Sequence, residues 1–217
     1  MHWRRLGLLG LLSTGALATG VASTPPGGEA RVPAHFDSYA NDPWFNELRT
    51  LKAHELDALF LSGEAKHIPL GQGVGFPLLD DSSQALNSFA TLFWRGKNIF
   101  PDSRDPKRAW LNNRVLGLGL VKANVYKGDT RKVLGLEGQS KGPSALRLYD
   151  IQTVGFDGRP SVILDYGTSD VPMARGIRDE IRQVWPKKYS NLYLGRAWIE
   201  GKFWVYFALK FKDANSL

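Results

Sequence analysis

The last apolar stretch is the feature that most constrains the fold of this chain. From Phe203 to Phe211 every residue except Lys210 is apolar or aromatic. Side chains of a strand point alternately to its two faces. One face would hold Phe203, Val205, Phe207, Leu209 and Phe211, and the other Trp204, Tyr206, Ala208 and Lys210. We expect the first face in the core, with Phe207 beneath a helix layer, and the second either in water or against a partly polar cavity. A strand that is apolar on both faces favours a closed barrel or a sheet covered by a helix.

Glycine-containing turns predict hairpins in the same region. Asp157-Gly158 precedes the β-branched run 161–166, and Gly201 lies between the runs 191–199 and 203–211. Glycine adopts positive φ without steric cost, and a tight hairpin turn requires it. We therefore predict a mainly β chain of the α+β class. Its sheet would be antiparallel and barrel-like, built of hairpins, with two or three covering helices.

The N-terminal residues have the pattern of an export signal. Residues 2–5 give a positive start, residues 6–18 an apolar centre, and residues 21–23, Val-Ala-Ser, a small-residue cleavage site. The apolar run is short for a membrane span, although a retained anchor is the alternative. We expect a signal peptide at 1–23, a flexible Pro/Gly-rich leader at 24–41 and a single β-rich domain at 42–217. The protein would then be exported, to the periplasm or the exterior.

The composition excludes several classes of protein. The chain has 217 residues, no cysteine and a formal charge of +7, which falls to about +5 without Arg4 and Arg5. Disulfides, thiolate metal ligands and cysteine nucleophiles are therefore excluded. The remaining histidines, His35, His54 and His67, lack the spacing of a metal pair, so we expect neither a metal nor a cofactor. Basic residues are scattered among acidic ones, which argues against a nucleic-acid partner and is compatible with peripheral contact with the envelope.

Two segments in the first half of the chain have helical spacing. Asp42-Pro43 is a typical helix start. An apolar stripe follows it as far as Gly63, a plausible end, with an interruption near Thr50. Ser83–Phe93 is expected to form a second, shorter helix.

The segment Met173–Trp185 is predicted to be a helix with a cationic face. In a helical projection Ile177 and Ile181 lie on one side, and Arg178 and Arg182 lie on the opposite side. A fork of arginines can clamp a carboxylate or a phosphate. The alternative is a solvated helix face that covers the sheet.

Glycines mark places where the chain turns or leaves space. Gly71, Gly73 and Gly75 lack the strand, helix and Lys-Ser/Thr context of a phosphate loop, so we interpret them as a turn or a strand edge. Residues 116–125 resemble a barrel strand with large residues on one face and almost none on the other. The room beside it suits a packed helix or, alternatively, a ligand. A short strand is also expected at Lys132–Leu136.

Several short motifs, taken together, carry a resemblance. They are Phe60 to Gly63, Trp94-Arg95-Gly96-Lys97 with Phe100, Leu148-Tyr149-Asp150, and Leu194-Gly195 before the aromatic last strand. This set resembles a bacterial family of unknown function that is named for a Gly-x-Trp-x-Gly motif. The family's tryptophan is missing here, where the corresponding run is Gly-Gln-Gly-Val-Gly. The resemblance implies a small antiparallel barrel of the calycin kind and implies no activity.

Catalytic signals are few. The chain has no Gly-x-Ser-x-Gly nucleophile motif. Asp165 lies inside an apolar strand, where a buried carboxylate needs a partner such as an arginine of residues 175–182. A structural salt bridge is one interpretation. The other is a small hydrolase, lyase or isomerase that uses Asp165 or Asp150 with an arginine and with Tyr166 or Tyr193.

The function that we expect is binding rather than catalysis. The export signal, the aromatic sheet and the scarcity of nucleophiles indicate an envelope protein that holds a lipid-like or other apolar, anionic small molecule. The ligand would lie in a barrel or in a cleft between sheet and helix. The candidate ligand-binding residues are Trp94, Arg95, Lys97, Arg178, Arg182, Trp204 and Tyr206.

Overall fold

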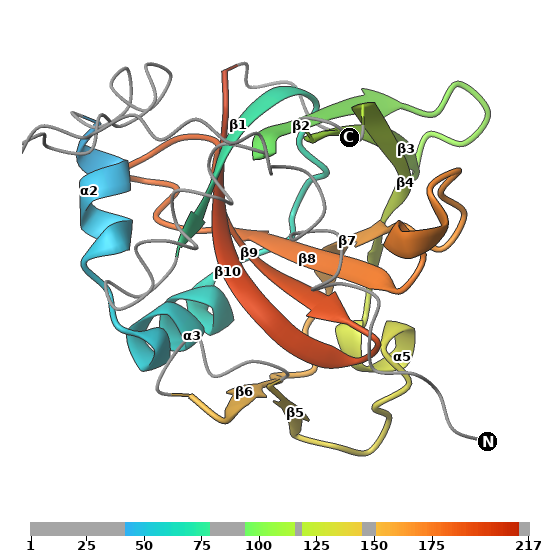
Figure 1. The fold of residues 1–217 in the computed structure, drawn as a ribbon. Coiled ribbons are helices and arrows are strands. Elements are labelled where there is room, and N and C mark those ends of the chain that lie inside the picture. Colours follow the sequence, from blue (N-terminus) through green and yellow to red (C-terminus); the bar gives the residue numbers. More distant parts are fainter. Residues whose placement is uncertain (1–41, 79–93, 116–118, 145–150, 213–217) are drawn as a thin grey trace, which may run out of the picture. The chain divides into compact units, whose positions relative to one another are not determined.

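Eight antiparallel strands close into a barrel in the computed structural model, which describes residues 42–78, 94–115, 119–144 and 151–212 (Figure 1). Around the barrel each strand pairs with its neighbour, and the last strand pairs with the first. In chain order the strands are β1 (Gly71–Leu78), β2 (Trp94–Pro101), β3 (Ala109–Val115), β4 (Gly119–Gly128), β7 (Ser161–Asp165), β8 (Ile177–Gln183), β9 (Leu192–Ile199) and β10 (Lys202–Phe211). The predicted fold class, an antiparallel barrel-like sheet with a few helices, is confirmed.

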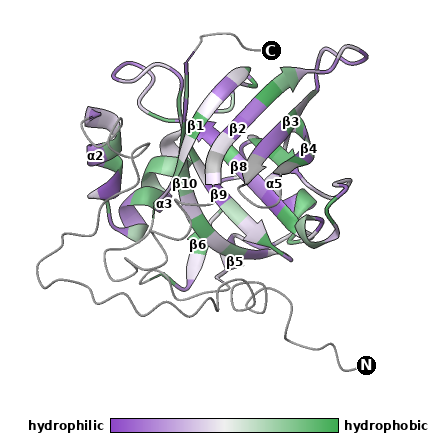
Figure 2. Ribbon diagram, turned by 45° about the horizontal axis from the view of Figure 1, so that its top comes forward, coloured by the Kyte–Doolittle hydropathy of each residue, from purple (hydrophilic) through white to green (hydrophobic). Residues whose placement is uncertain are grey.

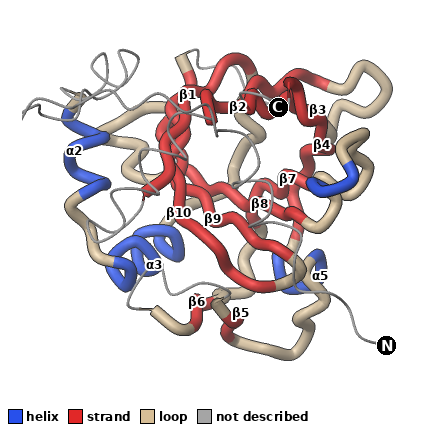
Figure 3. Tube along the Cα trace, in the orientation of Figure 1, coloured by secondary structure: helices blue, strands red, loops and turns tan. Residues whose placement is uncertain are grey.

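Short elements lie outside the ring of strands, as the tube view shows (Figure 3). They are the helices α2 (Pro43–Arg49), α3 (Ala53–Ser62) and α5 (Thr130–Val133), the 3-10 helix η3 (Pro172–Ala174), and a two-stranded sheet of β5 (Lys141–Pro143) and β6 (Thr153–Gly155). The predicted helix at 42–63 is confirmed, with Asp42 at its N-cap, a break at residues 50–52 and Gly63 at its C-cap. The predicted helix at 83–93 lies outside the described residues.

Two hydrophobic clusters form because the barrel wall has two apolar faces, and hydropathy alternates along several strands in Figure 2. The inner cluster lies on the inward face of the strands and includes Leu111, Val125, Leu164 and Phe207. The outer cluster lies between the barrel and its covering elements. It joins side chains of α2 and α3 to those of β1, β9 and β10. Filling of a small barrel by its own side chains is typical of eight strands.

A bulge in β10 overturns the predicted parity at the start of that strand, whereas Phe207, Leu209 and Phe211 share one face as predicted. The register shifts between Phe203 and Val205, so Phe203 joins Tyr206 in the outer cluster, while Trp204 packs against the inner one. A bulge inserts one residue and therefore exchanges the faces of all residues on one side of it. Phe207 is buried as expected, but it lies inside the barrel and not beneath the helices.

The predicted helix at 173–185 is wrong, because Ile177–Gln183 is the strand β8 in the wall of the barrel. Its inward residues, such as Ile181, meet the inner cluster, and Arg178 and Arg182 point outward. The run of seven residues carries charges at 178, 179, 180 and 182. Positions 178, 179 and 182 fit a helical stripe, and positions 178, 180 and 182 fit a strand alternation. Neighbouring strands decided the outcome, since β7 and β9 both pair with this segment.

Two smaller predictions around the covering elements are also wrong. Asp157-Gly158 is a turn, with Gly158 at φ 74°, but it does not join a hairpin, because β6 pairs with β5 and not with β7. Residues 130–133 form the helix α5 instead of a strand at 132–136. The predicted hairpin at Gly201 is confirmed: β9 pairs with β10, and Glu200 and Gly201 both have positive φ.

Candidate functional site

Among the described residues, the interior of the barrel contains one charged cluster, centred on Lys97 of β2. Its ammonium group donates to Asp179 Oδ2 at 2.9 Å, to the hydroxyl of Tyr166 at 2.6 Å and to Asn113 Oδ1 at 3.4 Å. Lys97 and Asp179 are 2% and 5% exposed. Because β2 and β8 are four places apart in a ring of eight strands, this ion pair spans the barrel from one wall to the opposite one.

Aromatic rings surround the ammonium group. Lys97 Nζ lies 5.1 Å from the ring centroid of Trp94, 5.2 Å from that of Tyr166 and 5.3 Å from that of Phe207. A cation is attracted to the face of such rings, and more strongly where water is excluded. Burial lowers the pKa of Lys97, against the opposing effect of the Asp179 carboxylate. Burial, together with that same carboxylate, raises the pKa of Tyr166 well above its ordinary value.

A glycine bulge in β2 places two of these residues on one face. Trp94 and Lys97 are three apart, so a regular strand would point them to opposite sides. The register shifts between them, and Gly96 has a φ of 102°, which favours glycine. A Cβ at Gly96 would also lie 2.2 Å from the carbonyl oxygen of Gly73. The Trp-Arg-Gly-Lys motif thus needs its glycine to bring tryptophan and lysine together.

The glycines of β1 face the same interior. A Cβ at Gly75 would lie 2.5 Å from the indole of Trp94, and one at Gly73 would lie 3.0 Å from the ring of Phe211. The segment interpreted as a turn or a strand edge is the strand β1, which is paired on both sides in the closed barrel. The rings of Trp94 and Phe211 fill the space over these two glycines.

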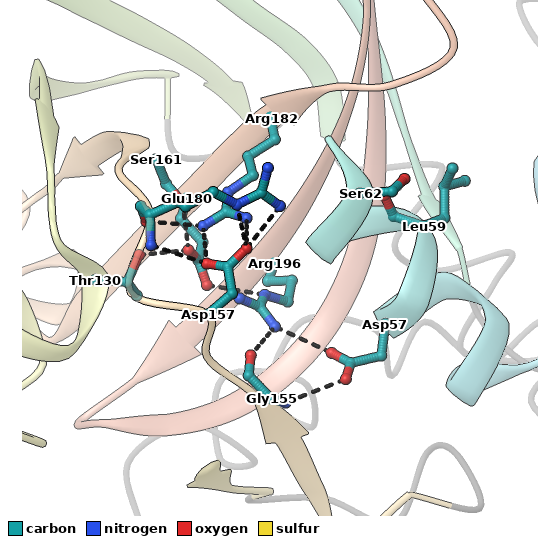
Figure 4. A network of polar contacts seen from close by, with 11 residues as sticks. Asp57, Leu59, Ser62, Thr130, Gly155, Asp157, Ser161, Glu180, Arg182 and Arg196 are labelled. Atoms are coloured by element: carbon teal, nitrogen blue, oxygen red, sulfur yellow. Dashed lines mark hydrogen bonds and ion pairs between the residues drawn. The ribbon is translucent and has the colours of Figure 1, made fainter. Parts of the chain in front are cut away.

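A second buried cluster lies on the outer face of the barrel, under the covering elements (Figure 4). The Glu180 carboxylate accepts four hydrogen bonds: Oε1 from Arg196 Nε at 2.8 Å and from Trp198 Nε1 at 3.0 Å, and Oε2 from Ser161 at 2.8 Å and from Thr130. An ionised carboxylate offers about four acceptor positions, so Glu180 is fully satisfied. We call this set, with its partners Asp57, Asp157 and Arg182, the ionic network.

The arginines of the ionic network connect the barrel to its covering elements. Arg196 donates to Asp57 Oδ1 of α3 at 3.0 Å and to the carbonyl of Gly155 at 2.8 Å. Arg182 binds both oxygens of Asp157, at 2.7 and 2.8 Å. The ring of Phe60, on α3, lies 3.8 Å from the guanidinium carbon of Arg196. Every charged group of the ionic network is paired inside the molecule, and this pairing offsets the free energy that is lost when the charges leave water.

The pKa of Asp157 reports the strength of these contacts. Burial by itself raises this pKa, but hydrogen bonds from Arg182 and Arg159 outweigh burial and hold the pKa well below its ordinary value. Asp157 is thus a charged partner of Arg182 at neutral pH. The guanidinium of Arg182, predicted to meet a ligand, is occupied by Asp157, by Ser161 and by the carbonyl of Arg159.

Asp165 forms the salt bridge that the sequence suggested. Its Oδ1 lies 2.9 Å from Arg178 Nε, and the two residues face each other across β7 and β8 on the outer side of the barrel. Tyr126 Oη lies 3.3 Å from Asp165 Oδ2, and burial, helped by that carboxylate, raises the pKa of Tyr126. The carboxylate therefore has an arginine and a tyrosine beside it, but the tyrosine is neither Tyr166 nor Tyr193.

An open hollow of about 380 Å³ lies beside the salt bridge between Asp165 and Arg178. It is lined by Trp110, Lys122, Ala123, Asn124, Thr168 and Asp170. Trp110 is 39% exposed, and its ring stacks on that of Phe100 with centroids 4.4 Å apart. Asn124 pairs with Asp165 in the strand register, so the hollow and the Asp165 salt bridge are neighbours.

The predicted site residues do not form one site. Trp94 and Lys97 meet Tyr166 inside the barrel, and Trp204 packs against the same inner cluster. Tyr193 also lies inside, edge-on to Phe211, and burial raises its pKa to about 12. The outer side of the wall holds Arg178, Arg182 and Tyr206. Asp150 and the side chain of Arg95 lie outside the described parts of the chain.

Three charged residues of these clusters were missed in the sequence. Asp179, Glu180 and Arg196 are each at most 5% exposed, and Arg196 lies in a strand whose other residues are mostly apolar. Asp165 was singled out on that same criterion. The interpretation of residues 173–185 as a helix with one face in water did not predict that the carboxylates of Asp179 and Glu180 are buried.

Comparisons with known proteins add no identity to this geometry. No protein-family model matches the chain, and no similar curated protein or solved structure was found. The resemblance to the Gly-x-Trp-x-Gly family therefore stays a prediction. Within the described ranges no three His, Cys, Asp or Glu side chains gather closely enough to hold a metal ion. None of the helices described there is both long and apolar enough to cross a membrane.

Proposed function

We propose that this chain is an exported envelope protein whose barrel binds a small amphiphile with an acidic head group. The observation that carries the proposal is the Lys97–Asp179 ion pair inside the barrel, in a cage of three aromatic rings. The export pattern of residues 1–23 supports the location in the envelope.

A buried ion pair is a poor device for stability alone. Removing two charges from water costs several kcal/mol per ion, and apolar replacements of similar volume are often neutral or stabilising, by roughly 1–4 kcal/mol. The ionic network on the outer face connects separate elements, which accounts for its presence. Lys97 and Asp179 connect opposite walls of a barrel that the strand pairing already closes. A polar group in an apolar interior is what a ligand head group requires.

The surroundings of Lys97 suit an apolar tail. Trp94, Phe207 and Phe211 are rings on rotatable side chains, and two of them lie against the glycines of β1. If a ring turns away from Gly73 or Gly75, it leaves a space over backbone that carries no side chain. The barrel interior beside Lys97 then has room for the tail of a ligand. The tail of the ligand would replace ring contacts with contacts of its own at little cost in apolar burial.

Charge balance decides how an acidic head group can bind. Lys97 and Asp179 together are neutral, so a bound carboxylate adds one negative charge to a dry interior. One proton taken up with the ligand, either by the ligand's carboxylate or by Asp179, restores neutrality and removes the cost of burying the extra charge. Binding of an acidic amphiphile should therefore take up one proton, and its affinity should fall about tenfold for each pH unit above neutrality.

The test is the pH dependence of binding by dansyl-undecanoic acid, followed by its fluorescence, with undecanol as a displacing competitor. We expect the affinity of the acid to fall from pH 7 to pH 8 and that of the alcohol to stay constant. Asp179→Asn removes the competing negative charge, so it should tighten binding of the acid and abolish the pH dependence. Arg178→Met, on the outer face, is the matched control and should change neither.

Absence of binding by both amphiphiles would contradict the proposal. Binding that Asp179→Asn leaves unchanged, or that Arg178→Met weakens, would place the ligand outside the barrel and would contradict it as well. Lys97→Met should abolish binding of the acid. A thermal melt of each variant separates lost binding from lost folding.

A further inference from the structure

We propose that the open hollow on the outer face of β3 and β4 is a binding site for a neutral oligosaccharide. The proposal is independent of the barrel interior, because Trp110, Lys122 and Asn124 point away from it. The residues that follow them in the chain, Leu111, Ala123 and Val125, belong to the inner cluster.

Trp110 supplies a platform for the flat, CH-rich face of a sugar ring. It is one of two large apolar side chains exposed in the described chain, the other being Met173. Its ring stacks on Phe100 of the neighbouring strand at an angle of 21°, and this contact holds the indole in place. Aromatic side chains with one exposed face lose little conformational entropy on binding, because they have only two rotatable bonds.

Short polar side chains surround this platform. Asn124 donates to the hydroxyl of Thr168 at 3.1 Å, and Lys122 lies 3.8 Å from Asp170. Together they offer amide, hydroxyl, ammonium and carboxylate groups, which is a mixture of donors and acceptors.

The charges of the hollow select against other ligands. A phosphate or nucleic-acid backbone needs unpaired cations, but Lys122 has Asp170 beside it and the neighbouring Arg178 is paired with Asp165. A lipid tail needs apolar walls, and apart from Trp110 and Ala123 the lining is polar. A sugar chain combines hydroxyl groups with apolar ring faces, and it carries no charge that either partner of the Lys122–Asp170 pair would repel.

The test is titration of the purified protein with two neutral tetrasaccharides, cellotetraose and the tetramer of N-acetylglucosamine. Binding is followed by NMR of the tryptophan indole N–H groups, and Trp110→Phe identifies the Trp110 signal. We expect saturable shifts of that signal by at least one tetrasaccharide, with a dissociation constant of about 1 mM or tighter. Trp110→Ala should weaken binding at least about tenfold, and Asn124→Ala should weaken it less.

Met173→Ala removes the other exposed apolar side chain and is the matched control, which should leave binding unchanged. Dansyl-undecanoic acid should not compete with the sugar. No binding of either tetrasaccharide at about 10 mM would overturn the proposal. Binding that perturbs other indoles but not Trp110, or that survives both Trp110→Ala and Asn124→Ala, would also overturn it. If Trp110→Ala does not fold, the Trp110 signal and Asn124→Ala decide the outcome.

Discussion

Single glycines determine how the interior of this barrel is filled. Gly96 allows the bulge that turns Trp94 and Lys97 to the same side, and the glycines of β1 accept aromatic rings. Gly195 of β9 is the clearest case, since it faces Phe207 across the strand pair and a Cβ there would lie 2.2 Å from the ring. Ring and glycine are therefore one packing unit, and their substitutions should not be additive.

This pair gives a prediction at the scale of residues. Phe207→Ala should lower the free energy of unfolding by about 3–5 kcal/mol, because it empties part of the barrel. Gly195→Ala should cost about 1–3 kcal/mol by overpacking. In the Phe207→Ala background the same Gly195→Ala change should cost close to nothing, since the ring it collides with is gone.

Denaturant unfolding of the two single variants and the double variant measures this coupling. Gly176→Ala is the control, because its Cβ would meet nothing closer than 3.4 Å, and it should behave the same in both backgrounds. Additive losses from Gly195→Ala and Phe207→Ala would mean that the ring does not occupy the space over Gly195.

At the scale of elements, the covering layer is attached to the barrel by charge as well as by apolar contact. Arg196 of β9 reaches α3 through Asp57 and β6 through Gly155, while Glu180 holds it from β8. The Arg178–Asp165 pair also joins two strands on the outer face, but it is partly exposed. The two arginines therefore differ in burial more than in the kind of partner.

The corresponding prediction compares Arg196→Met with Arg178→Met. Each change keeps the aliphatic part of the side chain and removes the guanidinium. Loss of the buried guanidinium leaves Glu180 without its charged partner and should cost about 3–5 kcal/mol. Loss of the partly exposed guanidinium of Arg178 should cost about 0–1 kcal/mol. Amide hydrogen exchange should also show faster exchange in α3 for Arg196→Met only. Equal costs in denaturant unfolding would show that the ionic network does not hold the covering layer.

At the scale of the whole molecule, the lowered pKa of Asp157 makes stability depend on pH. A carboxyl whose pKa is lower in the folded than in the unfolded chain stabilises the fold fully above its unfolded pKa, ordinarily 3.8, and loses this effect as the pH falls toward the folded pKa. The sign is therefore destabilisation by acid, in the range below about pH 4.

The prediction concerns Asp157→Asn, which removes the charge and keeps the size. At pH 7 it should lower the free energy of unfolding by about 1–3 kcal/mol, because Arg182 loses charged hydrogen bonds. The difference from the unmodified protein should shrink as the pH falls below about 4, because Asp157 then takes up a proton in the unfolded chain before it does so in the folded one. Asp105→Asn, on an exposed carboxylate, should show a small difference at every pH. A difference for Asp157→Asn that stays constant down to pH 2 would contradict the lowered pKa.

The sequence by itself determined the features that depend on neighbouring residues. The last strand, the hairpin at Gly201 and the two helices between Pro43 and Ser62 follow from periodicity, turn geometry and the break after residue 49. Only the tertiary structure decided which face of each strand turns inward, because one bulge exchanges the faces and its position depends on the paired strand.

The candidate site depended on tertiary structure even more. Lys97 and Asp179 are 82 residues apart in the chain and meet only because the barrel closes with β2 opposite β8. Asp179 and Glu180 are adjacent in sequence, yet one enters the barrel and the other joins the ionic network outside it. No local pattern separates two neighbouring carboxylates in this way. The physical reason is that a strand in a barrel wall has two buried faces, and only the pairing of the strands assigns each side chain to one of them.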